Sequence, residues 1–226
     1  MSQGLLPYLV EVGTRADTVT GRAGLPVVVE TLRALGLESV IETAVQVRER
    51  ASGYTEVEKI EALVLLLAAG GDCLDDIAVL KADAGLARLL GRTLPGPDTL
   101  RNFLLACHDP ALITAAQAER APGEVAYIPA ENAALQGLGQ VNGALVQRVA
   151  GQGRSTRATL EHDATVQESH KREAQVHYEG GRGYQPAGMY WVEQDLVVAD
   201  EYRDGNVPEE TVAGRRWYSP CFPGHR

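Results

Sequence analysis

The sequence is poor in cysteine, and the few cysteines that it has lie far apart. Its 226 residues include Cys73, Cys107 and Cys221, and no CxxC pair occurs among them. Disulfide frameworks and structural zinc sites need closely grouped cysteines or histidines. The sequence therefore supports neither kind of module, and it predicts a protein of a reducing compartment, the cytoplasm.

The chain also lacks an excess of positive charge and a long apolar run. Its formal net charge is −9, so any DNA contact would have to come from a local basic surface. The most apolar run, residues 62–69, is too short to cross a bilayer. The N-terminal MSQGLLPYLVEVGTRAD has no basic start followed by an apolar core, unlike a signal peptide. We expect a soluble protein with no membrane partner.

Apolar residues make up 45% of the chain, which is enough for a packed core. Residues 24–41, 54–71, 73–91 and 134–151 predict helices from their apolar spacing. Thr55 and Glu58 have the spacing of a capping box, and Gly70 with Gly71 suits a helix end. The apolar spacing also predicts that Ile77, Leu80 and Leu86 face inward.

Residues 94–107, a helix after a Pro/Gly turn, allow two interpretations. They fit a DNA-binding helix-turn-helix or a helical hairpin that only packs. We favour the hairpin, because acids outnumber bases between residues 72 and 109. Here we predict Asp98 as a helix N-cap and place Pro110 in a turn or at the first position of the next helix.

After a GQGRST linker the apolar pattern changes to a period of two. Glu161 and Asp163 share one face of a predicted strand with Thr159 and Thr165, and Leu160 begins the other face. Residues 183–194 and 195–206 predict two more strands, paired antiparallel through short turns. Paired carboxylates suit a Mg²⁺ site for phosphoryl transfer. Spacing alone also fits a solvated face with no ligand.

A longer stretch resembles a known family. Residues 160–208 contain DAT, SHKREA, YEGGRGYQP, YWVEQ and DEYRDGNVP in order. In this they resemble the start of the catalytic domain of bacterial DDE-type insertion-sequence transposases, and the preceding helical part resembles the N-terminal region of those proteins more loosely. The resemblance implies an RNase H-like catalytic domain in which three acids hold the divalent metals that cut and rejoin DNA ends.

The resemblance also implies roles for particular residues. Asp163, in DAT, matches the first catalytic acid and a metal ligand, and Glu161 is a weaker supporting ligand for Mg²⁺. Four basic side chains in the resembling stretches are candidate contacts to the DNA backbone: Lys171, Arg172, Arg182 and Arg203. They equally fit solvated charges paired with nearby acids.

The fold expected from both arguments is α+β. Residues 1–150 form a mostly helical region for DNA binding or dimerisation, and residues 151–208 form the first strands of an incomplete RNase H-like α/β domain. Residues 209–226 are an irregular tail that does not resemble the helix expected in the family after RDGNVP. Asp195, Asp200 and Asp204 match the third strand or its turn, so we interpret them as surface or turn acids.

The expected function is therefore that of a DDE transposase truncated before its second and third catalytic acids. One acid does not hold two Mg²⁺ ions for an in-line displacement, so the chain by itself is expected to be inactive. The alternative is a non-catalytic fragment that binds transposon DNA ends, or dimerises, and inhibits an intact transposase. The expected partners are DNA and a second copy or an intact transposase.

Overall fold

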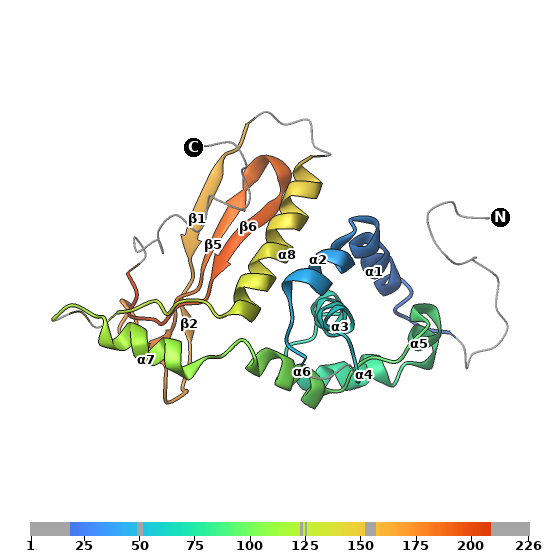
Figure 1. Cartoon of the computed structure of the whole chain (residues 1–226), viewed down its shortest axis with the longest axis horizontal. Helices are drawn as coiled ribbons and strands as arrows, with labels where there is room; N and C mark the ends of the chain where they lie inside the picture. Colours follow the sequence, from blue (N-terminus) through green and yellow to red (C-terminus); the bar gives the residue numbers. More distant parts are fainter. Residues whose placement is uncertain (1–18, 49–51, 123, 125, 152–156, 209–226) are drawn as a thin grey trace. The chain divides into compact units, whose positions relative to one another are not determined.

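The computed structural model describes residues 19–48, 52–122, 124, 126–151 and 157–208. The chain divides into two compact units, an N-terminal unit (Met1–His108) and a C-terminal unit (Asp109–Arg226) (Figure 1). Helices and small antiparallel sheets together confirm the mixed α+β class. Most of the predicted linker, the predicted tail and Cys221 lie outside the described residues. No helix within the described ranges is long and apolar enough to cross a membrane.

The described part of the N-terminal unit is helical. Its elements are α1 (Leu25–Ala34), α2 (Leu37–Ala44), α3 (Glu56–Ala68), η2 (Leu74–Asp76), α4 (Ile77–Lys81), α5 (Ala84–Leu90) and α6 (Pro97–Leu105). The inward positions predicted at Ile77, Leu80 and Leu86 are confirmed, because all three are buried in one apolar cluster. Leu65 of α3 and Leu100 of α6 complete the centre of this cluster, so one core joins helices that are distant in sequence.

The apolar repeat over residues 24–41 forms two helices rather than one. Gly36 separates α1 from α2 with φ +63°, in the left-handed region. A residue with a Cβ is strained there, so glycine is the natural choice. The periodicity persists across the break because Val29 and Ile41 both face the interior, and apolar spacing by itself does not reveal such a turn.

Both ends of α3 follow the sequence prediction. The Thr55 hydroxyl accepts a hydrogen bond from the Glu58 amide at 3.1 Å, and the Glu58 carboxylate accepts one from the Thr55 amide at 2.7 Å. At the other end Gly70 has φ +78°, and the Gly71 amide donates to the Leu66 carbonyl. The helix is therefore closed by a capping box and by a Schellman-type turn.

The start of α6 differs from the prediction. Its N-cap is Gly96, with Pro97 at the first helical position, so Asp98 is a first-turn residue and the N-cap prediction is wrong. Proline at that position sets the backbone angle and loses no hydrogen bond, which moves the helix start two residues earlier. Pro110 does occupy the first position of the next helix, one of the two predicted placements, where Asp109 is the N-cap.

The C-terminal unit places two helices before its strands. These are α7 (Pro110–Ala118) and α8 (Ala133–Ala150), followed by β1 (Leu160–Ala164), β2 (Gln167–Glu168), β3 (Gln175–Val176), β4 (Arg182–Tyr184), β5 (Ala187–Trp191), η3 (Val192–Gln194) and β6 (Leu196–Glu201). The strands pair antiparallel, as predicted, in the orders β1-β5-β6 and β2-β4-β3. The short β2 and β3 have no counterpart in the sequence prediction.

The two sheets share one continuous pairing register. Leu160 lies opposite Trp191 in the first sheet, and Glu168, eight residues further along, lies opposite Gly183, eight residues further back, in the second. The Thr165 amide donates to the Pro186 carbonyl at 3.0 Å between them. Residues 160–168 and 183–191 therefore form one long antiparallel pair, and alternation along it assigns every side chain to one of two faces.

Helix α8 covers one of these faces (Figure 1). Val146 of α8 is buried against Met189, Trp191 and Val198, all from the sheet. The Asn142 side-chain amide also donates to the Val198 carbonyl at 3.1 Å. The face turned toward α8 is therefore the apolar one, and the opposite face is the solvent face.

We predict that Thr55→Ala lowers the free energy of unfolding of the N-terminal unit by about 1 kcal/mol, because a helix amide loses its partner. Urea unfolding followed by far-UV circular dichroism measures the change. Thr43→Ala is the matched control, since its exposed hydroxyl only bonds back to the Ser39 carbonyl, and we expect a change within about 0.5 kcal/mol. Equal losses in both variants would contradict the capping argument.

Candidate functional site

The solvent face of β1 carries the carboxylates predicted from sequence. Glu161 and Asp163 are exposed, whereas Leu160, His162 and Ala164 between and beside them are partly buried. The predicted alternation is confirmed, so both carboxylates leave the strand on the same side. The structure thus brings the first matched acid and its supporting neighbour to one accessible surface.

A third acid joins this surface across the sheet. Asp163 lies opposite Gly188 of β5, and Gly188 lies opposite Asp200 of β6. We call Asp163, Gly188 and Asp200 the acidic row. Opposite residues of antiparallel strands point to the same face, and strands lie about 4.8 Å apart, so the two carboxylates stand on either side of the glycine. A Cβ on Gly188 would meet no heavy atom within 4 Å, so the space above it is open.

The acidic row fits Mg²⁺ in donor type. Mg²⁺ takes one or two carboxylates and completes its shell with water and phosphate oxygens. Within the described ranges no group of three or more His, Cys, Asp or Glu side chains is arranged to hold a metal. The sequence predicted Asp200 to be a surface acid on the third strand or its turn, and it is an exposed residue of β6. Only the pairing register reveals that it stands across Gly188 from Asp163.

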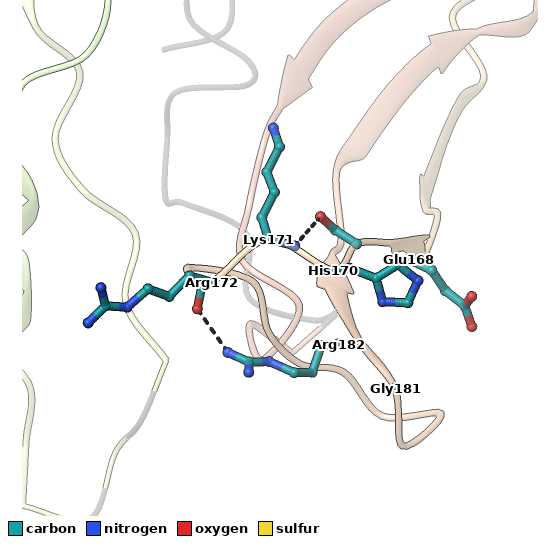
Figure 2. Close-up of a pocket in the computed structure, with 7 residues that line it drawn as sticks. Glu168, His170, Lys171, Arg172, Gly181 and Arg182 are labelled. Atoms are coloured by element: carbon teal, nitrogen blue, oxygen red, sulfur yellow. Dashed lines mark hydrogen bonds between the residues drawn. The ribbon is translucent and has the colours of Figure 1, made fainter.

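The second part of the site is an open hollow of about 380 Å³ in the β2-β4-β3 sheet. Its lining residues are Glu168, Ser169, His170, Lys171, Arg172, Gly181 and Arg182 (Figure 2). We call it the basic hollow, since three predicted DNA-contact residues, Lys171, Arg172 and Arg182, are among those that line it. Arg182 is ten residues from Arg172 in the sequence, and the pairing of β3 with β4 brings the two together.

The three basic side chains of the hollow differ in their interactions. The Arg182 guanidinium donates to the Ala174 carbonyl at 2.9 Å. It also donates to the Arg172 carbonyl at 3.0 Å (Figure 2), and the two bonds tie the loop to β4. In the part of the chain that the structure describes, no ion pair joins Lys171 or Arg172 to a carboxylate. Figure 2 shows their side chains leaving the loop in different directions. Both charges are therefore available to an anionic partner.

Arg203, the fourth predicted DNA contact, lies elsewhere. It is 3% exposed, and its Nε donates to the Gln185 carbonyl at 3.2 Å. The Gln185 amide in turn donates to the Arg203 carbonyl at 2.9 Å. In this structure Arg203 holds two neighbouring strands together and does not present its charge to the surface.

His177 supports the turn beside the basic hollow. It is 3% exposed, and its Nδ1 accepts a hydrogen bond from the Glu179 amide at 3.3 Å. A Cβ at Gly181 would lie 2.6 Å from its Nε2, so the imidazole packs directly against that glycine. His177 thus has a packing and hydrogen-bonding role, and the glycine is needed for the close approach of its ring.

Two tyrosines on the solvent face escaped sequence reasoning. The rings of Tyr184 and Tyr202 lie 5.1 Å apart between centroids and are tilted by 40°. Tyr184 is part-buried, whereas Tyr202 is 64% exposed. Asp204 pairs with Tyr184 in the adjoining strand segment, and burial raises the pKa of its carboxyl. We call Tyr184 and Tyr202 the tyrosine pair; only their spacing within two strand patterns hinted at it.

Comparison with known proteins gives no match: no protein-family model, no curated protein and no solved structure resembles the chain at a significant level. Any function must therefore be argued from the residues and geometry described above.

We predict that Asp204→Asn is more stable than the wild-type protein at neutral pH, and that this advantage shrinks as the pH falls. Burial raises the pKa of the folded carboxyl, so ionising it costs stability above that pKa, and the cost fades as the carboxyl takes up its proton. Urea unfolding of both proteins between about pH 4 and pH 8 checks the slope. A difference that stays constant over this range would contradict the assignment.

Proposed function

We propose that this chain is part of a DDE-type transposase, with β1 as the first strand of an RNase H-like catalytic domain. The observation that carries the proposal is that one continuous strand pair holds both chemistries that such an enzyme needs. Asp163 stands exposed on β1, and the same pair runs on into the basic hollow with Lys171 and Arg172. Carboxylates suit a divalent metal, and uncommitted cations suit phosphates.

In this proposal Asp163 and Asp200 would hold Mg²⁺, with Glu161 in support. A bound Mg²⁺ would supply charge neutralisation at a phosphate and lower the pKa of a bound water. The carboxylates of the chain hold that ion in place, while Lys171 and Arg172 bind the DNA backbone and orient it. Arg182 keeps the loop that presents those two cations in place.

The chain by itself is proposed not to cut and rejoin DNA. Asp163 matches the first of the three catalytic acids of the family, and the acidic row adds only one more carboxylate, that of Asp200. Two metal ions need more ligands than this to hold the attacking and leaving oxygens in line. Strand transfer would then require further acids besides Asp163 and Asp200.

The second candidate function is DNA binding without catalysis, in which the chain competes with an intact transposase for transposon ends. The specific observation in its favour is that none of the residues that line the basic hollow belongs to the acidic row. A net charge of −9 makes this contact local rather than general. The two functions share the hollow and differ only in whether the acidic row binds a metal.

We predict that the chain binds duplex DNA with an affinity that falls steeply with salt, and that Lys171→Ala/Arg172→Ala lowers the log–log salt slope by about 2, because two phosphate contacts are lost. Fluorescence anisotropy with a labelled mixed-sequence duplex over a KCl series measures the slope. Lys81→Ala/Arg88→Ala is the matched control: it removes the same two charges from exposed helix positions of the N-terminal unit. Equal slopes in both variants would contradict a role for the hollow.

We predict that Mn²⁺, as a paramagnetic substitute for Mg²⁺, broadens the backbone amide resonances of Asp163, Gly188 and Asp200 before those of other acids. Asp163→Asn should abolish this broadening, and Glu161→Gln should weaken it only partly. Broadening that appears equally at Asp75 and Asp76 of the N-terminal unit would contradict a metal site in the acidic row.

Mg²⁺-dependent strand cleavage that disappears in Asp163→Ala would contradict the proposed inactivity.

A further inference from the structure

The solvent face has a feature that neither the acidic row nor duplex binding explains. Tyr202 exposes 64% of its surface and leans on Tyr184, whose ring is tilted by 40° at a centroid distance of 5.1 Å. An exposed aromatic ring offers a flat face on which a nucleic-acid base can stack. Here a second ring lies in contact with the first, and we call the two together an aromatic platform.

One ring of the platform, Tyr184, lies on the strand that borders the basic hollow. Arg182 lines the hollow, and Tyr184 follows it two residues later on β4. Side chains two residues apart leave a strand on the same side. Arg182, whose guanidinium donates to the Arg172 carbonyl, therefore shares one face of β4 with Tyr184, and Tyr202 adds the second ring from the segment that follows β6.

We propose that this surface binds an unpaired stretch of single-stranded DNA. One base stacks on the exposed ring of Tyr202, Tyr184 supports that ring, and the neighbouring phosphates lie against Lys171 and Arg172. The inference rests on the proposed function for its choice of DNA and adds the state of the strand. Cationic grooves combined with aromatic platforms are the usual means of holding single strands without sequence preference.

The surroundings of the platform favour a single strand over a duplex or a protein partner. In a duplex the base faces are stacked on one another and are closed to an aromatic side chain. A protein partner of the usual kind would need a larger apolar patch. The strand positions that flank the tyrosine pair are polar instead, with Gln167 opposite Tyr184 on one side and Asp204 on the other.

The test compares a labelled oligothymidylate with a duplex of equal length by fluorescence anisotropy, using the full chain at fixed salt. We expect Tyr202→Ala to weaken single-strand binding by at least about fivefold and to leave duplex binding within about twofold. Tyr202→Phe keeps the ring and should stay within about twofold of wild type on both probes. Val197→Ala, an exposed side chain on another part of β6, is the control for nonspecific loss, and circular dichroism checks that each variant is folded.

The possible results separate this inference from the proposed function. If Tyr202→Ala binds both probes like wild type, or if Tyr202→Phe loses as much as Tyr202→Ala, the stacking role is overturned. Salt-dependent duplex binding and Mn²⁺ broadening at the acidic row would in that case still support the proposed function. If the single strand binds through Tyr202 while Mn²⁺ leaves the acidic row unchanged, the inference stands and the metal-dependent function fails. Tighter binding of oligouridylate than of oligothymidylate would overturn DNA as the partner.

Discussion

The unbroken pairing between residues 160–168 and 183–191 is the constraint on which the candidate site depends. Because the side chains of a strand alternate, one register decides at once which residues meet helix α8 and which meet solvent. A slip of β1 by one residue against β5 would turn Asp163 toward α8, into the layer where Met189 and Trp191 pack against Val146. The apolar contacts of α8 therefore do more than stabilise the sheet: they select the register that exposes the acidic row. Burial of a large side chain such as Trp191 contributes on the order of 2 kcal/mol, whereas burying an unpaired carboxylate costs more than that.

The same strand pair carries acids at one end and leads into the basic hollow at the other. The acidic row lies where β1, β5 and β6 run side by side, and the basic hollow lies where the long strand pair meets the β3–β4 turn. With a net charge of −9 the molecule as a whole repels a polyanion, so attraction must come from cations that no carboxylate neutralises. Arg182 makes this arrangement possible, because its hydrogen bonds go to backbone carbonyls and leave nearby acids uninvolved. A carboxylate partner for Arg182 would have lowered the charge of the hollow while performing the same structural task.

Local patterns predicted those parts of the structure that depend on neighbours in the chain. The capping box of Thr55, the glycine stop of α3 and the two faces of β1 all follow from residues within one or two turns. Non-local features were out of reach. Nothing within the sequence around Asp200 says that it stands across Gly188 from Asp163, and nothing around Tyr202 says that it touches Tyr184. Both facts follow from strand register, which is set by packing against α8.

The N-cap of α6 was misplaced for a different reason: Asp98 is a good capping residue, but Pro97 beside it is a better first helical residue, and the two signals compete.

Arg203 shows that a basic residue within a motif can be buried and bonded inside the sheet. It lies in DEYRDGNVP, among the residues that carry the family resemblance, and a basic residue in such a stretch invites a contact with DNA. The structure instead buries it on the face opposite the acidic row, with its Nε donating to the Gln185 carbonyl. The hydrogen bonds that Arg203 exchanges with Gln185 tie it to the neighbouring strand, so its position is formed together with that strand. A cation has to reach the surface before it can meet a phosphate. Exposure therefore separates the basic residues of this one stretch: Lys171 and Arg172 are exposed, and Arg203 is buried.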